Sequence, residues 1–102
     1  MERGECLDKA KAIISGEREQ TYNGPEDSFG RVGLLWTAYL RGKFGGAAPE
    51  IVAVDVALMM DLLKTARLQV APGHEDSWVD KAGYSGCGAE IGTNTKGEAA
   101  CS

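Results

Sequence analysis

Long apolar segments are missing from this 102-residue sequence. The longest uninterrupted apolar run covers residues 56–60, and Asp55 and Asp61 close it on either side. A transmembrane helix needs about 20 apolar residues, so none is expected. The first six residues also lack the apolar stretch of a secretion signal. We therefore expect a cytoplasmic protein that has no membrane partner.

Cysteine, histidine and positive charge are scarce. There are three Cys and no CxxC pair, and the single His, His74, has no Cys near it. This excludes the spacing of an ordinary zinc site and argues against a disulfide framework. The formal net charge is −4, with 11 basic and 15 acidic side chains. A nucleic-acid polymer is therefore a poor partner, because non-specific binding to phosphates needs a cationic surface.

Aromatic residues are also few, at 7%, whereas hydrophobic residues as a whole make up 43%. Aliphatic side chains must therefore supply most of the core of a domain of this length. We expect one all-α domain over residues 1–91, a compact bundle of about four helices, followed by a disordered tail over residues 92–102. The spacing of apolar residues predicts helices over 4–16, 28–41 and 49–68 and a fourth from about residue 75, and we expect no strand.

Two of these helices have distinctive apolar faces. The helix over 28–41 is the clearest amphipathic segment and carries one continuous stripe: Phe29, Val32, Leu35, Trp36, Tyr39 and Leu40. The helix over 49–68 is apolar around most of its girth. Such a helix is usually central in the bundle, although part of its surface could instead form a subunit interface. We therefore expect a homo-oligomer.

Asp55 is the most informative single residue, because on a helical wheel it falls in the middle of this apolar arc. A carboxylate in apolar surroundings is costly unless a partner satisfies it. One interpretation is a structural carboxylate that accepts hydrogen bonds from a neighbouring loop or helix end. The other is a functional site. The candidate partners are a metal ion, Arg18, Arg31, Lys64, Tyr22 and Tyr39.

A second group of residues suits a phosphorylated ligand. Lys64 and Arg67 could bind a phosphate, or they could be a solvated flank in which Asp61 pairs with Lys64. Arg18 and Tyr22, four residues apart, could bind a phosphate and stack on a base. Stacking could also come from Trp36 or from Trp78, which is otherwise a core anchor. The ligand-binding candidates are therefore Arg18, Tyr22, Trp36, Asp55, Lys64, Arg67 and Trp78.

The chain also resembles a family of small bacteriophage and prophage proteins filed as a domain of unknown function. The resemblance spans roughly residues 7–91 and lies in the segments EREQTYNGP (17–25), LWTAYL (35–40), DVALMM (55–60), KTAR (64–67) and DSWVDKAGY (76–84). It implies a phage-type origin, a helical fold and, for a phage-encoded protein, the host cytoplasm as location. It implies no particular activity.

Asp55-Val56-Ala57 and the aliphatic run after it are similar to the second motif of MazG-like all-α nucleotide pyrophosphatases. Those enzymes place Glu-Glu-x-x-Glu on one helix and Glu-x-x-Asp on another, and their carboxylates hold Mg²⁺. The resemblance implies a possible Mg²⁺ cofactor, with Asp55 as its ligand and as the catalytic residue. Here Val52 stands three residues before Asp55, where those enzymes have Glu.

Three functions follow from these patterns. The first is binding of a nucleotide-like or other phosphorylated small molecule, which could sequester a host defence signal. The second is a MazG-like, Mg²⁺-dependent nucleoside triphosphate pyrophosphatase. The third is inhibition of a host factor through the apolar girth of the helix over 49–68.

Overall fold

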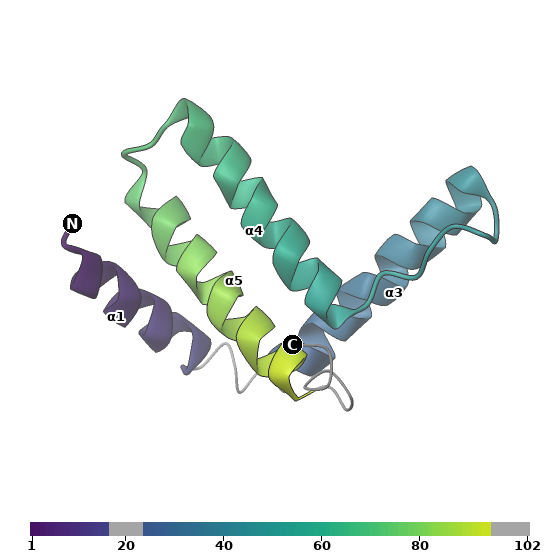
Figure 1. The fold of residues 1–102 in the computed structure, drawn as a ribbon, viewed down its shortest axis with the longest axis horizontal. Coiled ribbons are helices and arrows are strands. Elements are labelled where there is room, and N and C mark those ends of the chain that lie inside the picture. The colour runs from purple at the N-terminus through teal and green to yellow at the C-terminus, as the bar shows by residue number, and fades with distance from the viewer. Residues whose placement is uncertain (17–23, 95–102) are drawn as a thin grey trace.

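The structure, a computed structural model, describes residues 1–16 and 24–94 of the chain. The described residues form four α-helices and no strand, which confirms the all-α prediction (Figure 1). The helices are α1 (Arg3–Ile14), α3 (Pro25–Phe44), α4 (Ala53–Val70) and α5 (Glu75–Thr93). Part of the predicted tail is helical, because α5 ends only at Thr93. Residues 95–102 of that tail lie outside the described part.

The ends of α3 differ from the prediction because glycine and proline set them. Gly24 has a φ of 92° and Pro25 follows it in the first helical turn, so α3 begins three residues before Ser28. A proline fits there because the first N–H groups of a helix have no partner within the helix. The helix then continues through Gly42 and ends where Gly45 takes a φ of 102°.

The start of α4 was also predicted wrongly. Residues 49–52 are not helical, and α4 begins at Ala53 rather than at Pro49. The Thr37 hydroxyl explains this: it accepts the Ile51 N–H at 2.8 Å and donates to the Gly33 carbonyl at 2.7 Å. The extended segment is thus bound along α3. Gly33 lets it come close, since a Cβ there would lie 2.5 Å from the Ile51 carbonyl oxygen.

Glycines do not end α5, although they weaken a helix intrinsically. The helix runs through Gly83, Gly86 and Gly88 because these positions face neighbouring helices. A Cβ at Gly86 would lie 3.0 Å from the Ile14 side chain of α1, and one at Gly88 would lie 3.3 Å from the Ala57 Cβ of α4. Close packing therefore outweighs the low helix propensity of glycine.

The central helix is α5 rather than α4. It contacts the other three described helices, with α1 along one side and α4 antiparallel on the other (Figure 1). α3 packs against the start of α4 and then points away from the other helices (Figure 1). Residues 45–52 run back along α3 to the start of α4. α4 contacts α5 along one side and α3 at its start, so it is less central than predicted, and its remaining side is exposed.

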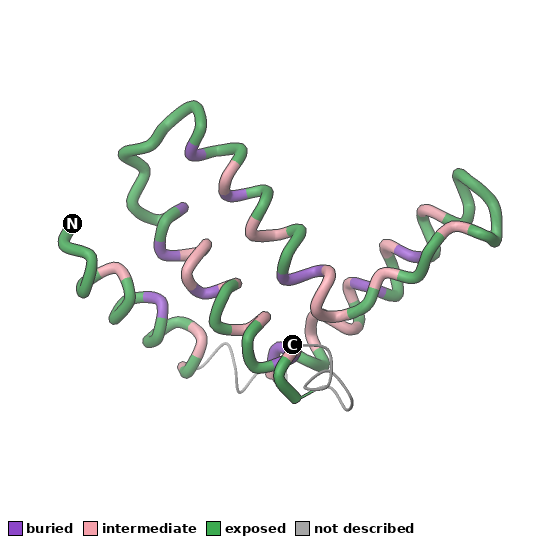
Figure 2. The backbone as a smooth tube through the Cα atoms, viewed as in Figure 1, coloured by how far each residue is buried: buried purple, intermediate pink, exposed green. Residues whose placement is uncertain are grey.

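The core of this arrangement is made mostly of small side chains. The buried apolar residues of the described chain are Ala10, Pro25, Val56, Ala57, Leu68, Val79 and Ile91 (Figure 2). The aromatic stripe of α3 is only partly covered. Leu35 is 70% exposed and Tyr39 is 65% exposed, whereas the other four are half-buried: Phe29, Val32, Trp36 and Leu40. The periodicity correctly grouped these residues on one side of a helix, but the described chain covers only part of that side.

Candidate functional site

Asp55 lies in the first turn of α4 and stabilises the start of that helix. Its Oδ2 accepts the Val52 N–H at 3.0 Å, which is one half of a capping box. Val52 has no side-chain acceptor and cannot form the other half. A carboxylate also interacts favourably with the positive end of the helix dipole. The geometry therefore matches the structural interpretation, and Val52, which was not among the predicted partners, is the group that Asp55 binds.

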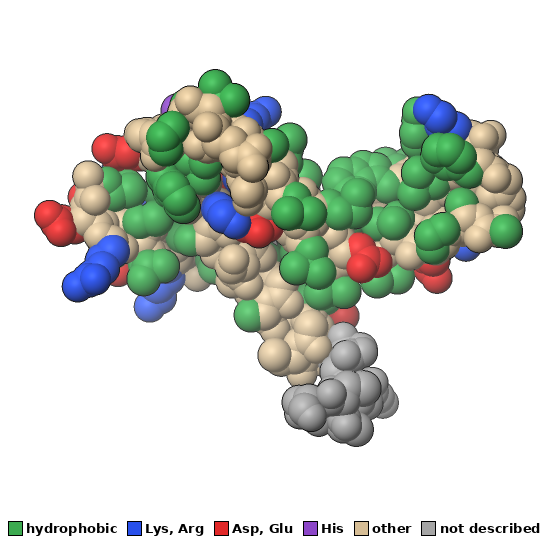
Figure 3. Space-filling model, turned by 45° about the horizontal axis from the view of Figure 1, so that its top comes forward, with side chains coloured by type: hydrophobic (Ala, Val, Ile, Leu, Met, Phe, Trp, Pro, Cys, Tyr) green, Lys and Arg blue, Asp and Glu red, His purple; other side chains and the backbone are tan. Residues whose placement is uncertain are grey.

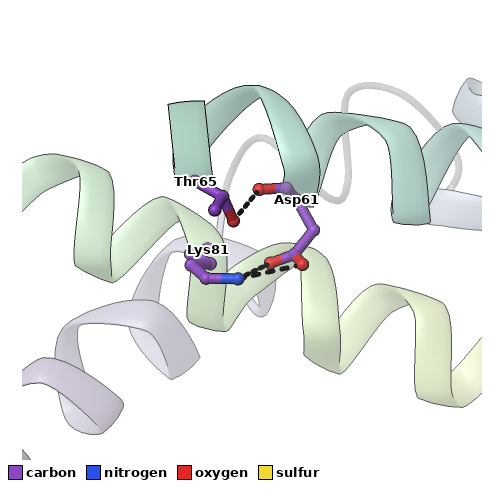
Figure 4. Close-up of polar contacts among 3 residues, drawn as sticks. All are labelled: Asp61, Thr65 and Lys81. Atoms are coloured by element: carbon purple, nitrogen blue, oxygen red, sulfur yellow. Dashed lines mark hydrogen bonds and ion pairs between the residues drawn. The ribbon is translucent and has the colours of Figure 1, made fainter. Parts of the chain in front are cut away.

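Asp61 and Lys64 of α4 bind across to α5 instead of pairing along their own helix. Lys64 Nζ lies 2.9 Å from Asp80 Oδ2, and the Lys64 side chain is only 11% exposed. Asp61 accepts two contacts from Lys81 Nζ, at 2.8 and 3.0 Å (Figure 4). The predicted Asp61–Lys64 pair is wrong. Because Asp80 neutralises Lys64, the predicted phosphate-binding lysine is already engaged within the fold.

The tryptophans lie far apart. Trp36 is half-buried on α3, which meets the start of α4, whereas Trp78 is near the start of α5, beside the end of α4. A helix of the length of α4 spans about 27 Å, so one mononucleotide cannot contact both rings. Trp78 is 45% exposed and donates its Nε1–H to the Pro72 carbonyl at 2.8 Å. Its interpretation as a core anchor is wrong.

Arg67 is exposed in the last turn of α4 and forms no ion pair with a described residue. Arg18 and Tyr22 lie outside the described residues. The structure thus leaves Trp36, Asp55, Lys64, Arg67 and Trp78 spread along the molecule. It does not gather these five into one pocket.

A cavity of about 220 Å³ lies where α1, the start of α3 and α5 meet. No motif in the sequence indicated it, because its lining comes from three distant segments. Phe29 and Tyr84 are neighbours there, with ring centroids 6.0 Å apart. The charged residue in its described lining is Asp80, which is already paired with Lys64. This lining suits an apolar group better than a phosphate.

The surface of the described chain also carries many exposed apolar side chains. One side of α4 exposes aliphatic side chains over its whole length, and we name this side the α4 outer face: Val52 (44% exposed), Leu58 (60%), Met59 (41%), Leu62 (64%), Leu63 (42%) and Val70 (88%). Asp55 lies among them at the start of the helix. The apolar arc around Asp55 therefore exists as predicted, but it points away from the core.

α3 also exposes large apolar side chains: Leu34, Leu35, Tyr39 and Phe44 are each about two-thirds exposed. Hydrophobic side chains are spread over both helices in the space-filling view (Figure 3). Soluble monomers rarely expose large contiguous apolar patches, and such patches commonly mark interaction surfaces. Both α3 and α4 thus present large apolar side chains to the outside of the described chain.

Metal-binding chemistry finds little support in the described part of the chain. Residues 1–16 and 24–94 contain no group of three His, Cys, Asp or Glu side chains placed to hold one ion. Asp55 stands alone at the start of α4, and its Oδ2 accepts the Val52 N–H. The Mg²⁺ site of a MazG-like pyrophosphatase would need several carboxylates together. In the same described residues, no helix is long and apolar enough to cross a membrane.

Fold and surface together define a small all-α domain with uncovered apolar faces. Comparison with known proteins identifies its family: residues 5–92 match the family described as "Domain of unknown function (DUF6378)". The chain belongs to this family.

Two of its relatives are phage proteins. The chain is 40% identical over 81 residues to the Gene 55 protein of Mycobacterium phage D29, covering 79% of this chain and 49% of the relative. It is 42% identical over 80 residues to the Gene 55 protein of Mycobacterium phage L5, covering 78% and 47%. The chain thus spans about half the length of these relatives. No solved structure matches.

These relatives confirm the resemblance to a phage protein family of unknown function. The likeness to MazG-like pyrophosphatases stays a prediction.

Proposed function

We propose that this domain is a protein-interaction module of a phage protein, and that another protein surface covers the apolar residues of α3 and α4. One observation carries the proposal: the larger apolar side chains are mostly exposed, while the core is built mainly of small residues. Leu35, Leu58 and Leu62 are each at least 60% exposed.

The energetics favour association. Burying a large aliphatic side chain stabilises a complex by roughly 1.5–3 kcal/mol when the chain was fully exposed before. Leu62 and Val70 are 64% and 88% exposed, so most of that stabilisation is still to be gained when a partner covers them. A partner that covered only the α4 outer face would therefore recover several such contributions at once.

The ligand hypothesis ranks lower on this geometry. Lys64 is paired with Asp80, and the two tryptophans lie at opposite ends of α4. Binding of a nucleotide-like molecule, with sequestration of a host signal, remains a prediction that calorimetry against cyclic and linear nucleotides would test. Inhibition of a host factor in the cytoplasm is one form that the interaction function would take.

Site-specific photo-crosslinking tests the proposal. A benzophenone amino acid replaces Leu35 or Leu58, and the control replaces Lys11, which is exposed on α1. Irradiation of cells that make the full chain should give one adduct of defined mass at Leu35 or Leu58, with this chain or with another protein. No adduct at either position, with the variants folded, would contradict the interaction function.

A further inference from the structure

The α4 outer face has the pattern of a helix-pairing seam. Residues 55, 59, 62, 66 and 69 recur at steps of three and four, which places them in one row along α4, and Val52 immediately precedes that row. Leu58, Leu63 and Val70 flank this row and are exposed. A row with this spacing packs against a second helix that lies nearly parallel or antiparallel to it.

We propose that this face binds the same face of a second copy of the chain, so that two α4 helices pack antiparallel about a twofold axis. This proposal rests on the interaction function proposed above, and it identifies the partner as a second copy of the chain. A twofold axis pairs one surface with itself, so the face must be self-complementary in both charge and shape.

Charge selects the antiparallel direction. Asp55 lies at the start of the face and Arg67 borders its far end, and neither forms an ion pair within the described residues. In a parallel pair, each would lie beside the same charge of the second copy. In an antiparallel pair, Asp55 of each copy comes within about one helical turn of Arg67 of the other. Each Asp55 then lies near the Arg67 of the other copy, and the two helix dipoles point in opposite directions, which is also favourable.

Side-chain size selects the register. With the axis between Leu62 and Leu63, Met59 of one copy faces Ala66 of the other, so a long side chain lies opposite a short one. At the centre, Leu62 of one copy faces Leu63 of the other. Towards the ends of the pair, Val70 of one copy lies opposite Asp55 of the other. Long side chains packed against short ones fill the space between two helices at normal interhelical distance.

The exposed area suits a weak dimer. A fully exposed large aliphatic side chain has on the order of 100 Å² of apolar surface to bury. The six residues of the face are 41–88% exposed, so together they present roughly 350 Å² per copy. A standard interface buries about 800 Å² per partner, so self-association through this face alone should be weak.

Sedimentation equilibrium of the full chain tests the association. At roughly 100 µM chain we expect the mass of two chains. Leu62→Glu should raise the dissociation constant at least about tenfold, since it places two carboxylates at the axis. Leu7→Glu is the matched control, because Leu7 on α1 is 63% exposed and Leu62 is 64% exposed. A control that dissociates equally would overturn the assignment to α4.

Exchanging the charges of Asp55 and Arg67 gives a second test of the dimer, which does not depend on whether Leu62→Glu folds. Asp55→Arg and Arg67→Asp should each weaken the dimer, and the double variant should restore it, because opposite charges meet again. Thermal unfolding followed by circular dichroism measures separately the stability that Asp55→Arg loses with the Asp55–Val52 hydrogen bond. Failure of the double variant to restore association would overturn the antiparallel pairing.

Disulfide trapping checks the register in a background with Cys6→Ala, Cys87→Ala and Cys101→Ala. Leu62→Cys should link to itself, whereas Met59→Cys should link only to Ala66→Cys, because two copies of position 59 are about 10 Å apart along the axis. A link of Met59→Cys to itself would show a parallel pair. A monomeric chain that still forms adducts with another protein would overturn the self-pairing and leave the interaction function standing.

Discussion

At the scale of single residues, this chain uses its polar groups mainly to fix helix positions. Thr37 binds the segment before α4 to α3, Asp55 caps α4, and Lys64 joins α4 to Asp80 of α5. The sequence showed that Asp55 and Lys64 were unusual. It could not show their partners, because Asp80 is distant in the chain and the Val52 N–H is a backbone group.

Gly33→Ala should destabilise the fold by about 1–3 kcal/mol, because a Cβ there would lie 2.5 Å from the Ile51 carbonyl oxygen. Urea unfolding measures the change. Gly30→Ala on the same helix is the control: a Cβ at Gly30 meets no atom within 4 Å, so a better helix former should leave stability unchanged or raise it by up to about 1 kcal/mol. Equal behaviour of both variants would contradict the close approach of residues 51 and 33.

Lys64→Met should lower the free energy of unfolding by about 1–3 kcal/mol, since it leaves Asp80 without its cation in partly buried surroundings. The comparison is Lys9→Met, whose partner Glu5 is on the open surface of α1. Lys9 holds the pKa of the Glu5 carboxyl below its ordinary value, mainly through their hydrogen bond. Exposed pairs contribute little. Thermal unfolding at neutral pH should therefore separate the two variants clearly.

At the scale of helices, apolar spacing predicted which segments are helical but not where they begin. Pro49 resembles the first residue of a helix, yet the hydrogen bond from Ile51 to Thr37 keeps residues 49–52 extended. Likewise the glycines of α5 suggest an early end. Only their contacts with Ile14 and Ala57 explain why the helix continues. Both errors arise from tertiary contacts that local propensity does not include.

Gly88→Leu should destabilise the packing of α5 on α4 by roughly 2 kcal/mol or more, because a Cβ at Gly88 already lies 3.3 Å from the Ala57 Cβ. Gly42→Leu on α3 adds the same side chain where a Cβ meets nothing within 4 Å. Chemical unfolding followed by circular dichroism measures both. A Gly88 variant as stable as wild type would mean that the two helices separate easily.

At the scale of the whole molecule, the sequence predicted the all-α class and the phage family, but it did not assign the apolar faces to core or surface. Periodicity groups Leu58 and Leu62 on one side of a helix, as it does Leu35 and Tyr39. It carries no information about which neighbour covers that side. The described chain covers α4 on the side of Val56 and Leu68, and the larger side chains point outward.

Oxidative footprinting of two methionines tests most directly whether a second copy covers the α4 outer face. Met59 and Met1 are 41% and 45% exposed in the single chain, so they should react at similar rates if nothing covers either. In the concentrated full chain, we predict that Met59 is oxidised at least about fivefold more slowly than Met1, and that Leu62→Glu removes the difference. Equal oxidation of Met59 and Met1 in the wild-type chain would contradict the account.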